Sequence, residues 1–247
     1  MPTQIEKLEA HAEHLLDAFL ALRERYAMLD PLLFDQAVCA ARGSGRQWRG
    51  LVALRTTLFL SCAQDIAKLA TDNDERAPSL SNIALALRDE KFAAALKARY
   101  AAWVIPSIEN ETDPEIAEAL RLLEIDERAG RADEFDRHLR DLLALVSQLA
   151  DSPEVKAFRT IRDKVTAHTE IRFVADKYQL LDIPALGLKW REIAPTIASL
   201  QQAVALVGMV VRNAGFAWET LDKQLSEMAR EFWAPTPAEP RVAPPQA

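Results

Sequence analysis

The sequence has few of the residues that mark turns, disulfides or membrane spans. Seven glycines among 247 residues is few, while alanine and leucine are abundant, and this composition is typical of helices. Cys39 and Cys62 are too few for a disulfide framework. No apolar run approaches the roughly 20 residues that span a bilayer, and the first residues lack the pattern of a signal peptide. We therefore expect a soluble, cytoplasmic protein that has no membrane partner.

Several catalytic motifs are also missing. The glycines at 43 and 45 lack the Lys-Ser/Thr pair of a phosphate-binding loop, and no serine lies in a nucleophile elbow. His11 and His14 could share a helix face, but nothing nearby supplies a distinctive third metal ligand. We interpret these two histidines as solvated side chains, and we expect no metal and no cofactor.

Charge is unevenly distributed along the chain. The net charge of -7 disfavours a protein that coats nucleic acid nonspecifically, because phosphate binding needs clustered cations. Residues 111–141 hold eleven acids and five arginines, whereas residues 155–172 hold five bases and two acids. The basic window fits a phosphate-bearing substrate held at one place, although a solvated helix face is the commoner meaning of such a window.

Helical spacing of apolar residues covers most of the chain. We predict helices over about 4–28, 48–69 (the most buried), 92–103, 112–150 with a possible break at 129–131, and 190–228, together with shorter helices near 33–38 and 83–87. Capping residues predict starts at Ser79 or Ser81, at Thr112-Asp113-Pro114 and at Ser152-Pro153, and residues 173–188 look irregular or hairpin-like. The fold class is thus all-α, with about six to eight helices in one domain (1–232). Five of the thirteen prolines predict a disordered Pro-rich tail over 233–247.

The segment FRTIRDKVTAHTE, residues 158–170, combines an arginine and a histidine at the end of a predicted helix. On a regular α-helix, Arg162 and His168 would flank one apolar stripe about 120° apart. They could not hydrogen-bond each other, but both could face a groove completed by the same helix of a second protomer. Histidine can act as acid or base near neutral pH, and arginine can stabilise phosphate charge. Such a pair suits metal-free cleavage of RNA.

The stretch from Arg162 to His168, RDKVTAH, resembles the R-x(4-6)-H motif of the HEPN superfamily, including the polar residue directly after the arginine. Together with the upstream stretch LFLSCAQDIAKL, it is similar to the abortive-infection AbiU-type branch. The resemblance implies an α-helical bundle, dimerisation through the motif helices and catalytic roles for Arg162 and His168. It gives Asp163 an orienting role, with weaker claims on substrate binding for Lys164 and Thr166.

Asp65 lies within that upstream apolar stretch, where a carboxylate needs a partner. It could form a structural salt bridge or support the active site.

These observations lead to one expected function and two alternatives. We expect a homodimeric HEPN-like endoribonuclease of bacterial toxin or phage-defence type, which cleaves RNA by 2′-hydroxyl attack without a metal. A separately encoded antitoxin could be a further partner. The first alternative is a non-catalytic HEPN-like dimer that binds RNA or protein and acts as a regulator. The second is a helical scaffold in which the motif is accidental.

Overall fold

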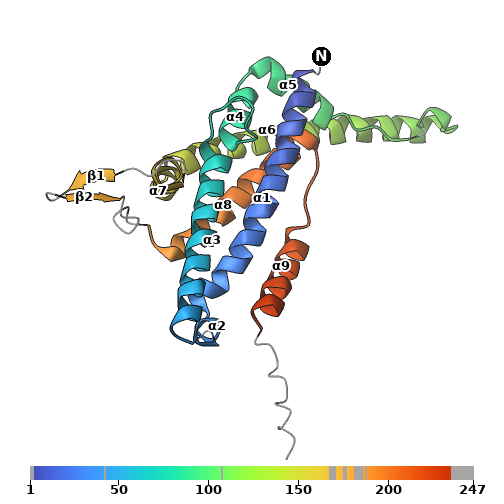
Figure 1. The fold of residues 1–247 in the computed structure, drawn as a ribbon. Coiled ribbons are helices and arrows are strands. Elements are labelled where there is room, and N and C mark those ends of the chain that lie inside the picture. Colours follow the sequence, from blue (N-terminus) through green and yellow to red (C-terminus); the bar gives the residue numbers. More distant parts are fainter. Residues whose placement is uncertain are drawn as a thin grey trace, which may run out of the picture. The chain divides into compact units, whose positions relative to one another are not determined.

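The computed structural model describes residues 3–41, 43–106, 108–166, 171–174, 177–180, 186 and 188–234. These residues contain nine α-helices (Figure 1), which confirms the predicted all-α class. The α-helices are α1 (Gln4–Phe34), α2 (Gln36–Ala41), α3 (Arg46–Thr71), α4 (Leu80–Leu87), α5 (Glu90–Tyr100), α6 (Pro114–Asp151), α7 (Pro153–Ile161), α8 (Ile193–Val207) and α9 (Trp218–Trp233). The tail predicted from residue 233 lies outside the described residues beyond Ala234.

Shorter elements connect the helices. Within the described ranges they include the 3₁₀ turns η1 (Ile108–Asn110) and η4 (Trp190–Glu192) and the π-helical turns η2 (Arg162–Thr166) and η5 (Gly208–Arg212). Strands β1 (Ile171–Val174) and β2 (Lys177–Leu180) pair antiparallel, with Ile171 opposite Leu180. The prediction of hairpin-like structure after the motif is therefore confirmed over these strands.

The chain divides into two compact units. Unit 1 comprises residues 1–22 and 62–216, and unit 2 comprises residues 23–61 and 217–247. Helices α1 and α3 each run through both units. The assignment of residues 1–232 to a single domain remains a prediction.

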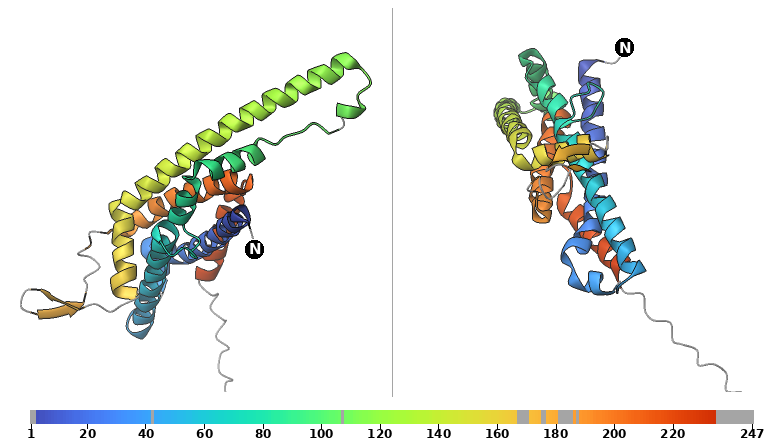
Figure 2. Two further views of the ribbon diagram at one scale, coloured as in Figure 1. Left: turned by 90° about the horizontal axis from the view of Figure 1, so that it is seen from above. Right: turned by 60° about the vertical axis from the view of Figure 1, so that its left-hand side comes forward.

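Unit 1 is organised around the long helix α6. This helix packs against α4, α5, α7 and α8, and its first half extends beyond the other helices of the unit (Figure 2). The fully or nearly fully buried side chains include Phe135 and Leu142 of α6, Phe158 and Ile161 of α7, and Leu200 and Val204 of α8. Burial of each such side chain contributes on the order of 1.5–3 kcal/mol to folding, so apolar packing holds α7, the helix that leads into the motif, in place.

Unit 2 has a smaller apolar core. Leu32, Val38, Leu51 and Trp233 form its buried cluster. The Trp233 Nε1–H donates a hydrogen bond to the carbonyl oxygen of Met28, at 3.2 Å. Helix α3 was predicted to be the most buried helix, but this is wrong for its first half, where Leu54 is 42% exposed and residues 46–50 are all exposed.

Three helix starts predicted from capping residues are confirmed. The Ser79 hydroxyl accepts a hydrogen bond from the Asn82 backbone N–H. At the starts of α6 and α7, the carboxylate of Asp113 and the hydroxyl of Ser152 likewise accept hydrogen bonds from backbone N–H groups of their own helices. A proline follows each of these two capping residues in the first turn. A side-chain acceptor satisfies a backbone donor that the helix itself leaves unpaired, which is why these boundaries are readable from local sequence.

The end predicted for the first helix at about residue 28 and the possible break at 129–131 do not occur. Helix α1 continues through Pro31 to Phe34, because Leu29 and Leu32 beside the proline are fully buried and their packing offsets the lost hydrogen bond. Helix α6 passes through Gly130 without a break. Ion pairs from Arg128 to Glu124 and from Arg131 to Glu127 span this region, and such pairs favour the helix.

One predicted helix is interrupted instead. The segment 190–228 is not continuous, since α8 passes into η5 and Asn213 then takes a left-handed conformation with φ of 50°. The chain turns tightly here, and the Ala214 N–H donates to the carbonyl oxygen of Gly208 at 3.2 Å. A Cβ atom at Gly208 would lie 2.8 Å from the Ala214 oxygen. The turn therefore depends on a glycine that looked like an ordinary helix interior position.

Residues Trp190–Arg212 form one helical stretch that is long and apolar enough, by length and composition alone, to cross a membrane. The prediction that no apolar run approaches the length of a membrane span is therefore wrong for this stretch. Ile193, Ile197, Leu200 and Val204 of this stretch are buried inside unit 1. Core helices that pack inside a protein meet the same criterion of length and composition.

Candidate functional site

The motif begins where α7 changes into a wider helical turn. Ser152 caps α7, and Val155, Phe158 and Ile161 anchor its buried face. From Arg162 to Thr166 the backbone is π-helical, with bonds five residues apart instead of four; such turns are rare and frequent at functional sites. The 120° separation predicted for Arg162 and His168 assumed a regular α-helix, and this assumption does not hold over Arg162–Thr166; the separation itself stays a prediction. His168 itself lies outside the described residues.

Arg162 is held by carboxylates from two directions. Its Nε–H donates a hydrogen bond to Oδ1 of the neighbouring Asp163 at 2.7 Å. Its Nη1 lies 3.9 Å from Oδ2 of Asp72, at the end of α3. The Arg162 side chain is only 19% exposed. Arginine presents a planar set of donors, so contacts at two different nitrogens restrict the orientation of that plane.

Asp163, the polar residue after the arginine, also faces a second cation. Its Oδ2 lies 3.8 Å from Nε of Arg159, one turn earlier on α7. Asp163 therefore accepts from Arg162 with one oxygen and faces Arg159 with the other. This geometry is suited to the orienting role that the resemblance implies.

Asp72 was not identified from the sequence. It is 90 residues away from Arg162 in the chain, and it starts the loop between α3 and α4. Its Oδ1 accepts the Asp74 backbone N–H at 3.1 Å, and its carbonyl oxygen accepts the Ser79 hydroxyl at 2.6 Å. The only local signal was the stretch TDND, whose aspartates favour side-chain-to-backbone turns; nothing in it points to α7.

The other predicted site residues lie on α3 and in the π-helical turn. Asp65 is half-buried on α3, about two turns before Asp72, and its supporting role remains a prediction. Lys164 is half-buried in the π-helical turn, and the backbone of Thr166 closes that turn. The structure thus brings Arg162, Asp163 and Asp72 together, while the substrate-binding roles of Lys164 and Thr166 stay predictions.

The loop that carries Asp72 has a second, independent charge pair. The guanidinium of Arg76 donates to both carboxylate oxygens of Asp74, at 3.0 and 2.9 Å. These hydrogen bonds, together with one from the Arg76 backbone, lower the pKa of Asp74 to about 2. Asp74 is thereby engaged within its own loop, and in the contacts described here it is Asp72 that reaches Arg162.

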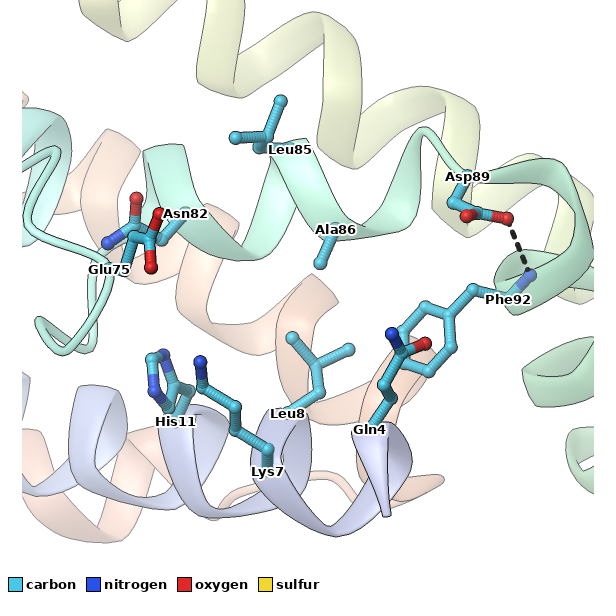
Figure 3. A pocket seen from close by; sticks show the side chains of 10 residues that line it. All are labelled: Gln4, Lys7, Leu8, His11, Glu75, Asn82, Leu85, Ala86, Asp89 and Phe92. Atoms are coloured by element: carbon cyan, nitrogen blue, oxygen red, sulfur yellow. Dashed lines mark hydrogen bonds between the residues drawn. The ribbon is translucent and has the colours of Figure 1, made fainter.

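A separate pocket of about 420 Å³ lies in unit 1 between the start of α1 and the α4–α5 region (Figure 3). Its lining includes Lys7, His11, Asn82, Asp89 and Phe92, and no residue of the motif. Burial, and then the nearby Lys7 and His14, lower the pKa of His11. Among the described side chains, no group of three or more His, Cys, Asp or Glu residues is placed to hold a metal ion.

Comparison with known proteins gives one informative result. The family model of the HEPN type described as AbiU2 matches residues 5–232, nearly the whole chain. No curated protein matches the chain, and no solved structure does. The match includes α3, the loop after it that carries Asp72, and the whole Arg-to-His segment. The chain therefore belongs to the AbiU2 family of HEPN proteins.

Proposed function

We propose that this protein is a metal-independent endoribonuclease of the bacterial toxin or phage-defence type, acting in the cytoplasm during abortive infection. The observation that supports this proposal most strongly is that two carboxylates hold the Arg162 side chain. The motif arginine begins a π-helical turn and is held by Asp163 and Asp72. A cation held in one orientation can stabilise charge that develops on a phosphate without reorganising during the reaction.

The proposed reaction uses the residues of the motif. In the proposed dimer, one His168 removes the proton from the RNA 2′-hydroxyl and the second protomer's His168 protonates the leaving 5′-oxygen, since a group that titrates near neutral pH can act as base or acid. The 2′-oxygen then bonds to phosphorus while the bond to the 5′-oxygen breaks, which gives a cyclic phosphate. Arg162 stabilises the charge on the phosphate oxygens and Asp163 orients Arg162. Lys164 and Thr166 contact the RNA.

The active form is proposed to be a homodimer built through the motif helices, which brings two Arg162–His168 sets together. Membership of a HEPN family supports this part of the proposal. A separately encoded antitoxin would then be a protein that covers this composite site or separates the protomers.

One observation favours a second candidate function. An arginine paired with two carboxylates is also what a structural arginine looks like. A HEPN-like dimer that binds RNA or protein without cutting it would keep the same contacts. The difference between the two functions is chemical, so the test has to follow bond cleavage as well as binding.

The test compares wild type and His168→Ala on single-stranded RNA with a metal chelator present. His14→Ala is the matched control, because His14 lies on α1 with its side chain 71% exposed and pairs only weakly with Asp17 at 3.7 Å. The proposal predicts cleavage by wild type and by the control, and loss of cleavage in His168→Ala at equal folded amounts. RNA binding without cleavage by all three proteins would establish the regulatory function instead.

A further inference from the structure

Hydrogen bonds within its own loop hold Asp72 in place, independently of its contact with Arg162. Its Oδ1 accepts the Asp74 N–H at 3.1 Å, and its Oδ2 is the oxygen that faces Arg162. The loop is in turn fastened to the start of α4, because the Ser79 hydroxyl donates to the Asp72 carbonyl at 2.6 Å and the Asn82 side chain donates to the Asp74 carbonyl at 2.6 Å. These hydrogen bonds together restrict the position of the Asp72 carboxylate.

The two carboxylates around Arg162 constrain different parts of the guanidinium. Asp163 engages Nε from the adjacent position in the same helical turn, and this contact moves whenever the turn moves. Asp72 faces Nη1 from the loop that follows α3, and therefore ties the guanidinium to the body of unit 1. Both partners of this second pair are less than a third exposed, at 19% and 29%, so solvent screens their attraction less than it would at the surface.

We infer that Asp72 is a positioning residue of the Arg162–His168 site, which holds the guanidinium in the orientation that phosphate has to meet. This inference rests on the proposed ribonuclease function. The 3.9 Å separation between Arg162 Nη1 and Asp72 Oδ2 is an ion pair without a direct hydrogen bond. A phosphate oxygen can therefore bind the same guanidinium without first breaking a short contact to Asp72.

Positioning has a kinetic signature that a merely structural role lacks. Removing the negative charge of Asp72 lets Arg162 rotate, which lowers kcat. The same change removes an anion from beside the phosphate site, so RNA affinity stays constant or rises. A side chain that only stabilised the fold would instead reduce the amount of active protein, leaving the kcat and the Kd of the folded fraction unchanged.

The test uses Asp72→Asn in the full-length chain, since asparagine keeps the acceptor for the Asp74 N–H and loses the charge. Asp74→Asn is the matched control, an acid of the same loop whose carboxylate pairs with Arg76. Asp72→Glu is a second variant that keeps the charge but displaces the carboxylate. Folding of each is checked by circular dichroism, and the Arg162 Nε–Hε signal of ¹⁵N-labelled protein is assigned by its loss in Arg162→Lys.

We expect Asp72→Asn to lower kcat by up to about fivefold without weakening RNA binding, and to speed rotation of the Arg162 guanidinium. Asp72→Glu should recover part of the kcat, and Asp74→Asn should match wild type. An unchanged Arg162 signal in both Asp72 variants would overturn the inference, as would a loss of RNA affinity in Asp72→Asn. If wild-type protein cuts no RNA, the proposed function fails, while the Arg162 signal still decides whether Asp72 holds the guanidinium.

Discussion

Replacing Arg162 by lysine keeps the positive charge but removes the planar set of donors. The hydrogen bond from Arg162 Nε to Asp163 at 2.7 Å is of the charge-assisted kind, which contributes about 1.5–3 kcal/mol. The Asp72 pair adds on the order of 1 kcal/mol or less after solvent screening. A lysine ammonium is a compact point charge, and it can reach one of these carboxylates while losing the contact with the other.

The cost to catalysis follows from these magnitudes. If the lost 1.5–3 kcal/mol is stabilisation of the transition state, the rate falls by roughly 10- to 150-fold, at about 1.4 kcal/mol per factor of ten. Folding stability should fall by less, about 1–2 kcal/mol, because lysine still pairs with one acid. Single-turnover cleavage of a labelled RNA measures the first effect and urea unfolding measures the second. Cleavage by Arg162→Lys within twofold of wild type would refute the role given to the guanidinium geometry.

Two further predictions concern the fold and its response to pH. Gly208→Ala should lower the free energy of unfolding by about 1–3 kcal/mol, because its Cβ would lie 2.8 Å from the Ala214 oxygen; Gly130→Ala, with open space around it, should be neutral or stabilising by up to about 1 kcal/mol. Urea unfolding of both variants checks this pair, and equal losses would contradict the account of the turn. The pKa of His11 is lowered in the folded state, so unfolded protein binds the proton more readily. The free energy of unfolding is therefore highest above the usual histidine pKa of about 6.5, and it falls as the pH drops below that value. His11→Gln should flatten this pH dependence in unfolding curves between pH 7.5 and 5.5.

Local rules predicted much of the fold because they act over three or four residues. The caps at Ser79, Asp113 and Ser152 are decided by one side chain and a nearby backbone donor, so the sequence alone locates them. The continuation of α1 through Pro31 depends on burial of Leu29 and Leu32. No local pattern contains that information, and the same is true of the turn after Gly208.

The candidate site likewise contains a local contact that the sequence predicts and a long-range contact that it does not. Arg162 and Asp163 are neighbours in a recognisable motif, and their contact is one that the sequence pattern anticipates. Asp72 contacts the same arginine across 90 residues of sequence, and only the packing of the folded chain brings the end of α3 to α7. The π-helical turn is a further feature that apolar periodicity missed, since that periodicity was read at 3.6 residues per turn.

The central claim is that Arg162 and His168 cleave RNA without a metal. It is tested most directly by incubating wild type, His168→Ala and the His14→Ala control with single-stranded RNA and a chelator, and by analysing the ends of any products. The account predicts products with cyclic phosphate or 3′-phosphate ends from wild type and the control, and none from His168→Ala. Intact RNA in every reaction, or equal cleavage by His168→Ala, would contradict it.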